Sequence, residues 1–232
     1  LFRSLEAMSA AAISMVHLSR LAEELVLWSS AEFGFVEIGD AFTTGSSMMP
    51  QKKNPDVAEL VRGRTGRVIG DLVSLLVTLK ALPMTYNRDL QEDKPPLYDA
   101  LDTWGAALEV TARMIPRVSF RKDRLREALR EGFVTATELA DHLVVRGVPF
   151  REAHEVVGKL VGQCVREGRL LDELSLEELR AVEPRFGDDA LAWLDVEAAV
   201  ERRDVPGGPA RARVAEALAA ARAAVEAASA EA

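Results

Sequence analysis

Several residue types that define particular protein classes are scarce in this chain of 232 residues. It has one cysteine, so no disulfide can form within it, and we expect a reducing, cytoplasmic setting. The three histidines, His17, His142 and His154, lie too far apart to form a local metal site with neighbouring carboxylates. We interpret them as structural, because a lone histidine among apolar neighbours is more often packed than catalytic.

Long apolar segments and an excess of positive charge are also absent from the sequence. The longest apolar run near the start, Ala10 to Ile13, is too short for the hydrophobic part of a signal peptide or for a membrane span. The 29 lysines and arginines are outnumbered by 37 aspartates and glutamates, giving a formal net charge of -8. We therefore expect neither a nucleic acid nor an anionic membrane as a partner.

The apolar residues, 48% of the chain, follow a helical spacing over three long stretches. We predict helices at residues 1–31, 55–82 and 97–117, because apolar side chains recur there at intervals of three and four residues. Long helices with short connections are typical of a bundle. Beyond them the predicted helices become short. The sequence therefore predicts an all-α protein with a long-helix bundle over residues 1–118 and a small helical domain over 119–232.

Local signals add detail to both predicted domains. In the second, two capping boxes mark helix starts, Thr135 with Glu138 and Ser175 with Glu178. In the first, the helix at 55–82 carries glycines that are costly inside a helix. These are Gly63, Gly66 and Gly70. Their spacing indicates a close crossing with another helix. The broad apolar arc of the same helix predicts that the chain oligomerises through it.

The most informative stretch leads into that helix from a polar loop at residues 40–55, here called the signature loop. It contains Gly45-Ser46-Ser47-Met48-Met49-Pro50-Gln51-Lys52-Lys53-Asn54-Pro55, and Asp56 follows it. Asn54 suits the N-cap of a helix and Pro55 its first position. A phosphate-binding loop would need a glycine where Gln51 stands, and a nucleophile elbow would need one two residues after its serine. The small residues predict a mobile loop that closes over a ligand.

This stretch resembles the Gly-Ser-Ser-x-Met-Pro-x-Lys-x-Asn motif of the fumarase/aspartase superfamily, whose members release fumarate from a substituted succinate. A second block, from Leu82 to Lys94, is similar to the argininosuccinate lyase family, to which the lens protein delta-crystallin is related. Two blocks in the expected order identify the chain as a member of that family. Since the family's chains are considerably longer, the resemblance implies the C-terminal portion of such a protein.

The resemblance implies a role for each residue that matches the family's motif. Ser46 matches the catalytic serine, a general base that removes a proton from the carbon next to a carboxylate, although sequence alone would not choose between Ser46 and Ser47. Lys52 matches the cation that stabilises the resulting aci-carboxylate. Ser47 and Asn54 would contact the substrate in the same region. Glu59 matches a carboxylate that holds Lys52 in place.

The resemblance also implies that the second block, from Leu82 to Lys94, supplies substrate-binding residues. Tyr86, Gln91 and Lys94 match residues that hold the substrate's carboxylates and its arginine-like end. Read alone, they would be ordinary polar residues of a loop. The implied reaction is the reversible cleavage of argininosuccinate to arginine and fumarate, a step of arginine biosynthesis that uses no cofactor and no metal.

The resemblance also implies an assembly, because the family forms homotetramers whose active sites lie where three subunits meet. Two conserved regions upstream of the signature loop have no match in these 232 residues. We therefore expect the isolated chain to have no lyase activity. Two alternatives stay open: a superfamily lyase acting on adenylosuccinate, malate or aspartate, and a crystallin-like structural homologue or inactive fragment.

Overall fold

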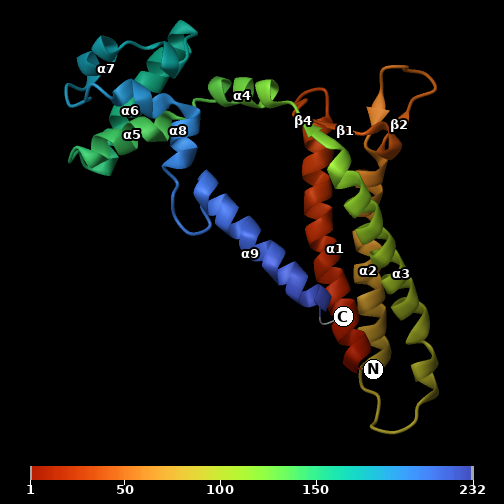
Figure 1. The fold of residues 1–232 in the computed structure, drawn as a ribbon. Coiled ribbons are helices and arrows are strands. Elements are labelled where there is room, and N and C mark those ends of the chain that lie inside the picture. Colours follow the sequence, from red (N-terminus) through yellow and green to blue (C-terminus); the bar gives the residue numbers. More distant parts are fainter. Residues whose placement is uncertain (1, 231–232) are drawn as a thin grey trace. The chain divides into compact units, whose positions relative to one another are not determined.

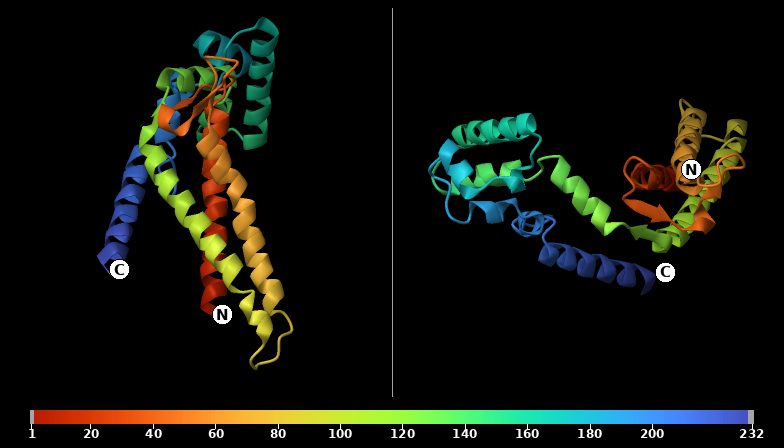
Figure 2. Two further views of the ribbon diagram at one scale, coloured as in Figure 1. Left: turned by 90° about the vertical axis from the view of Figure 1, so that its right-hand side faces the viewer. Right: turned by 90° about the horizontal axis from the view of Figure 1, so that it is seen from above.

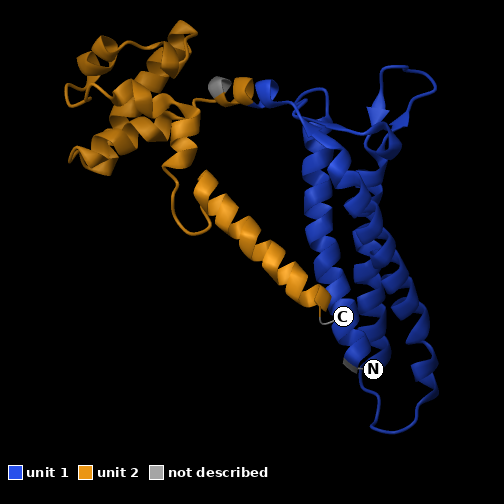
Figure 3. Cartoon of the chain, viewed as in Figure 1, with its two compact units in different colours: residues 1–125 blue, residues 126–232 orange. Residues whose placement is uncertain are grey.

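The computed structural model describes residues 2–230 of the chain, most of them helical (Figure 1). Contacts within the chain divide it into two compact units, Leu1–Leu125 and Arg126–Ala232 (Figure 3). The boundary predicted from the sequence, between residues 118 and 119, stays a prediction. Within the described residues, no helix combines the length and the apolar character that a membrane span needs.

Three long helices that lie side by side form most of unit 1 (Figures 1 and 2). They are α1 (Phe2–Ser29), α2 (Asp56–Leu79) and α3 (Lys94–Met114). The predicted helices and the all-α prediction are thereby confirmed, with helix ends that differ by a few residues. Helix α3 begins earlier than expected, because its two prolines lie in the first turn, where no backbone N–H is needed.

The seam between these helices is filled by apolar side chains from the predicted helical stripes. Met8 and Met15 of α1 form one buried cluster with Val68 and Leu75 of α2. Burying a side chain of this size contributes about 1.5–3 kcal/mol to stability. The indole N–H of Trp104 on α3 also donates to the hydroxyl of Ser14 on α1, at 2.9 Å.

Short strands close the end of the bundle at which α1 ends. Strand β1 (Val36–Ile38) pairs antiparallel with β4 (Val118–Phe120). The short 3-10 helices η1 (Asp40–Phe42), η2 (Arg88–Gln91) and η3 (Ile115–Arg117) complete the connections of unit 1. The β1–β4 pairing thus joins the segment that follows α1 to the segment that follows α3.

The three glycines of α2 do not mark a helix crossing within the described part of the chain. A Cβ added at Gly63, Gly66 or Gly70 would meet no atom within 4 Å. Nearby on α2, Leu60 is 59% exposed and Val73 is 51% exposed. This face of α2 is therefore both apolar and open, and the predicted crossing with another helix stays a prediction.

Ala81, just past the end of α2, has a left-handed backbone with φ 56°. Glycine adopts this conformation without the clash that a Cβ causes. We expect Ala81→Gly to raise the free energy of unfolding by about 0.5–1 kcal/mol, because the strain relieved exceeds the entropy gained by the unfolded chain. Urea denaturation measures the change.

The matched control is Ala106→Gly, an exposed position in the middle of α3. The same substitution there should lower the free energy of unfolding by about 1 kcal/mol, since glycine is a poor helix former. Destabilisation of both variants would contradict the strain assigned to Ala81.

Unit 2 consists of shorter helices, as the sequence predicts. They are α5 (Ala136–Val145), α6 (Phe150–Glu167), α7 (Leu176–Val182), α8 (Val196–Glu201) and α9 (Arg211–Ala230). Two 3-10 helices, η4 (Leu171–Glu173) and η5 (Ala190–Leu194), lie between them. Helix α4 (Lys122–Glu131) contains the division between the two units. Leu139, Leu160 and Cys164 are fully buried in the core of this unit. Burial raises the pKa of the Cys164 thiol.

Of the two predicted capping boxes in unit 2, one is confirmed and one is wrong. The Ser175 hydroxyl accepts from the backbone N–H of Glu178 at 3.2 Å, and the Glu178 carboxylate accepts from the Ser175 N–H at 2.7 Å. The Thr135 side chain makes no such bond. Its expected partner Glu138 is buried and forms ion pairs with Arg202 and Arg203 instead. A buried carboxylate needs such partners more than a helix start needs a cap.

The histidines differ in their surroundings. His142 is fully buried, its ring is stacked with Phe186 at a centroid distance of 5.8 Å, and its Nε2 accepts from the Gly187 N–H at 3.1 Å. Burial lowers the pKa of His142, and the nearby Arg146 adds to this effect. His142 is thus structural, as predicted. The expectation of a packed His17 is wrong, because its side chain is exposed on the outer face of α1.

Candidate active site

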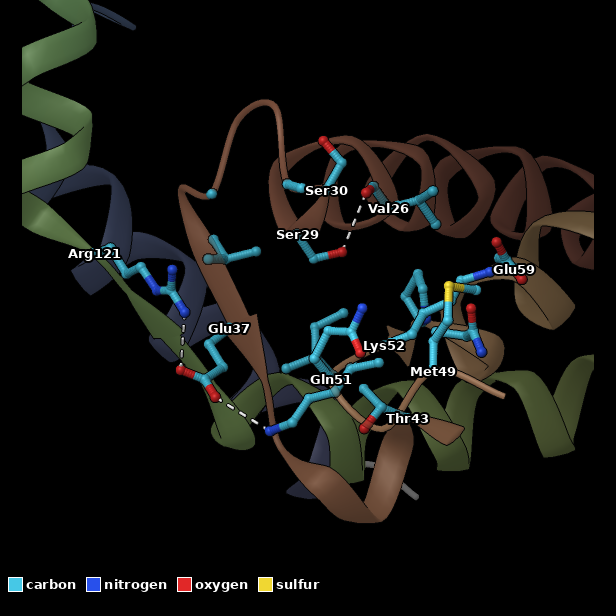
Figure 4. Close-up of a pocket in the computed structure, with 17 residues that line it drawn as sticks. Val26, Ser29, Ser30, Glu37, Thr43, Met49, Gln51, Lys52, Glu59 and Arg121 are labelled. Carbon is cyan, nitrogen blue, oxygen red and sulfur yellow. Dashed lines mark hydrogen bonds and ion pairs between the residues drawn. The ribbon is translucent and has the colours of Figure 1, made fainter. Parts of the chain in front are cut away.

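A cavity of about 690 Å³ lies in unit 1, where α1 ends and α2 begins (Figure 4). Its walls are the last turn of α1, strand β1, the second half of the signature loop and the first turn of α2. Lys52, Asn54 and Glu59 line it, which brings together three of the residues predicted for the site. The cavity is large enough to hold a small organic acid.

The base of the signature loop is a small hairpin, which the sequence did not predict. Strand β2 (Thr44–Gly45) pairs antiparallel with β3 (Lys53–Asn54). The Asn54 side-chain amide donates to the Thr44 carbonyl at 3.3 Å, and the Thr44 hydroxyl donates to the carboxylate of Asp56. The prediction that Asn54 caps α2 is therefore wrong. Its side chain is used within the hairpin, and the helix begins at Asp56 after Pro55.

Ser46 and Ser47 lie in the loop beyond this hairpin and do not line the cavity. The Ser46 oxygen accepts from the backbone N–H groups of Met48, at 3.2 Å, and Met49, at 3.1 Å. Such donors favour the negatively charged form of an oxygen over the neutral one. Ser46 is half-buried, whereas the Ser47 side chain is exposed. The geometry thus distinguishes two serines that the sequence alone left equivalent.

Lys52 and Glu59 both border the cavity, and both side chains are exposed (Figure 4). The backbone N–H of Lys52 donates to the Met49 carbonyl at 3.0 Å. No ion pair joins Lys52 and Glu59 in the part of the chain that the structure describes. The predicted support of Lys52 by Glu59 therefore stays a prediction.

The lysine of the loop that does form ion pairs is Lys53, which sequence reasoning missed. Its Nζ lies 2.6 Å from Asp40 Oδ1 and 3.3 Å from Glu37 Oε1. Glu37 also pairs with Arg121 at 3.4 Å (Figure 4). The hydrogen bond to Asp40 is the main cause of the raised pKa of Lys53. The contact with Lys53 is likewise the main cause of the lowered pKa of Glu37. The feature of the sequence that could have drawn attention to Lys53 is the pair of adjacent lysines, Lys52 and Lys53, shortly before a helix.

The second predicted group of site residues lies beyond the other end of α2. Tyr86 is 76% exposed, and its oxygen accepts from an Arg88 N–H at 3.4 Å. Gln91 ends η2, and Lys94, at the start of α3, pairs with Asp93 at 3.0 Å. Helix α2 has 24 residues and is therefore about 36 Å long. The chain does not bring Tyr86, Gln91 and Lys94 to the cavity at the signature loop.

Comparison with known protein families gives two matches that cover separate parts of the chain. Residues 3–70, which include the signature loop, match the family described as "Lyase". Residues 133–201 match the family described as "Argininosuccinate lyase C-terminal".

Curated proteins named argininosuccinate lyase are similar to nearly the whole chain. The protein of Syntrophotalea carbinolica is 54% identical, over 91% of this chain and 46% of its own length. That of Pelotomaculum thermopropionicum is 56% identical over 93% of this chain and 47% of its own length. That of Thermus thermophilus is 54% identical over 93% of this chain and 46% of its own length. The chain spans about half the length of the curated relatives it matches.

Solved structures agree in fold. EDDS lyase in complex with formate is 31% identical, with a TM-score of 0.84 over 96% of this chain and 46% of that one. A class II fumarase from Schistosoma mansoni is 16% identical, with a TM-score of 0.65 over 79% of this chain and 40% of that one, a likeness of fold alone.

Proposed function

We propose that this chain, which belongs to the argininosuccinate lyase family, is part of an enzyme that cleaves argininosuccinate reversibly to arginine and fumarate. The observation that carries the proposal is the identity of 54–56% to lyases of that name over about nine-tenths of the chain. The cavity lined by Lys52, Asn54 and Glu59 supports it. The reaction would serve arginine biosynthesis in the cytoplasm.

In this proposal Ser46 is the general base, and the loop backbone makes that role feasible. A serine hydroxyl is a weak base at neutral pH, so its alkoxide needs stabilisation. The N–H groups of Met48 and Met49 already donate to the Ser46 oxygen. Ser46 would remove the proton from the carbon next to a substrate carboxylate. The electron pair left on that carbon would then move into the carboxylate.

The charge that develops on this aci-carboxylate needs a cation and hydrogen-bond donors around it. Lys52 would supply the cation, Ser47 and Asn54 the donors, and Glu59 would orient Lys52 once the loop closes. The charge then returns to form the carbon–carbon double bond of fumarate, the bond from the neighbouring carbon to the arginine nitrogen breaks, and that nitrogen takes up a proton as arginine leaves. Because the substrate's own carboxylate accepts the charge, the proposed steps use neither a metal nor a cofactor.

The proposed site is shared between copies of the chain in a homotetramer. Tyr86, Gln91 and Lys94 lie beyond the far end of α2, a helix about 36 Å long, so they would serve the site of another copy. The open apolar face of α2, with Gly63, Gly66 and Gly70, supports close packing of helices from different copies.

A substrate panel tests the proposed function in the protein that contains this chain. Argininosuccinate, adenylosuccinate, malate and aspartate are each supplied, and release of fumarate is followed by its absorbance. We expect release from argininosuccinate alone. Preference for another substrate would indicate a different lyase of the superfamily, and no release from any of them would indicate a structural homologue.

A further inference from the structure

The two adjacent lysines at the base of the signature loop have different surroundings. Lys53 forms ion pairs with Asp40 and Glu37, whereas no ion pair in the described part of the chain involves Lys52. Lys53 begins β3, Lys52 directly precedes it and Asn54 follows it, and all three residues line the cavity. A contact that holds Lys53 therefore also restricts where the backbone of Lys52 and Asn54 can lie.

The carboxylates that hold Lys53 are themselves well supported. Glu37 is the middle residue of β1, and its neighbours Val36 and Ile38 are each only 3% exposed. The same carboxylate pairs with Arg121, directly after β4, so it is held from two sides. Asp40 begins the 3-10 helix that follows β1. Lys53 is thus bound to the part of unit 1 that closes the bundle.

The hairpin formed by β2 and β3 needs such an anchor. Each strand has two residues, and an isolated two-stranded hairpin is marginally stable in water. The bonds of Thr44 and Asn54 stay within the hairpin and the first residue of α2. Among the described contacts of the hairpin side chains, those of Lys53 lead to β1 and η1.

We propose that Lys53 is a positioning residue: it fixes the base of the signature loop to β1 and η1, so that Lys52 and Asn54 are held at the cavity. Its effect on catalysis rests on the proposed function, but the anchoring itself is a property of this chain. Exposed ion pairs are individually weak, so the expected effect is moderate and confined to the loop.

Hydrogen exchange on the chain tests the anchor without any assay of activity. Lys53→Met keeps an apolar stem and removes the charge, and amide exchange over residues 44–54 should become about fivefold faster. Lys53→Arg should restore most of the protection, and Asp40→Asn should weaken it. As the control, Lys159→Met removes a lysine that pairs with Glu155 of its own helix at 3.0 Å and should leave the loop unchanged. Unchanged loop exchange in Lys53→Met overturns the proposal.

Turnover of argininosuccinate by the protein that contains this chain tests the consequence. Lys53→Met should lower kcat about fivefold, and Lys53→Arg should recover it. A lower kcat without faster loop exchange would mean that Lys53 acts on the substrate directly, and faster exchange with unchanged kcat would mean that the anchor does not position the site. Either result overturns the proposal. If the unaltered protein releases no fumarate, the proposed function fails, while hydrogen exchange still decides whether Lys53 anchors the loop.

Discussion

Ser46→Ala is expected to lower kcat by about 10²- to 10⁴-fold in the protein that contains this chain, the range typical of a lost general base. The substitution removes the oxygen that would take the substrate's proton, and no other hydroxyl receives the Met48 and Met49 N–H groups. Rates of fumarate formation at saturating argininosuccinate measure the effect.

The matched control for this prediction is Ser47→Ala, the adjacent and more exposed serine. Because Ser47 is assigned to substrate binding, its loss should act mainly on KM. Sedimentation of both variants should show the assembly of the unaltered protein. A Ser46→Ala enzyme that turns over at the normal rate would remove Ser46 from the mechanism. A larger loss of kcat in Ser47→Ala would transfer the role of base to Ser47.

A mixture of two inactive variants is expected to regain activity if the site is shared between copies. Ser46→Ala removes the base, and Lys94→Met removes a substrate contact beyond the opposite end of α2. Dissociating the two variants, mixing them equally and reassembling them gives hybrids in which some sites draw an intact Ser46 from one copy and an intact Lys94 from another. We expect roughly one quarter of the normal activity, since each site draws its two halves independently.

The control mixture pairs Ser46→Ala with Lys52→Met. Both residues lie in the same signature loop of the same chain, so no hybrid site can contain both intact residues. This mixture should stay inactive. Recovery in both mixtures, or in neither, would contradict a site that takes Ser46 and Lys94 from different copies.

The helices were predictable from the sequence because they depend on local spacing. Apolar stripes specified α1, α2 and α3, and the pair Ser175 and Glu178 specified the start of α7. Predictions from local patterns failed where a side chain forms its bonds with residues far away in the sequence. Glu138 fits a capping box, yet its carboxylate binds arginines more than 60 residues later.

The same distinction applies to the candidate site. The loop motif led directly to Lys52, Asn54 and Glu59, which line one cavity. The importance of Lys53 was hidden, because its partners Glu37 and Asp40 are 16 and 13 residues away and do not belong to the motif. The pairing of β1 with β4 is equally non-local, so no spacing within either segment could predict it.

The burial of Cys164 has a practical consequence for spectroscopy. Its thiol is fully buried and burial raises its pKa, so a maleimide dye or a nitroxide reagent, which reacts with an accessible thiolate, should label it poorly. Met48, at 88% exposure, offers the opposite environment. A single Met48→Cys substitution therefore gives a chain that can be tagged at the tip of the signature loop alone, with the native thiol left in place.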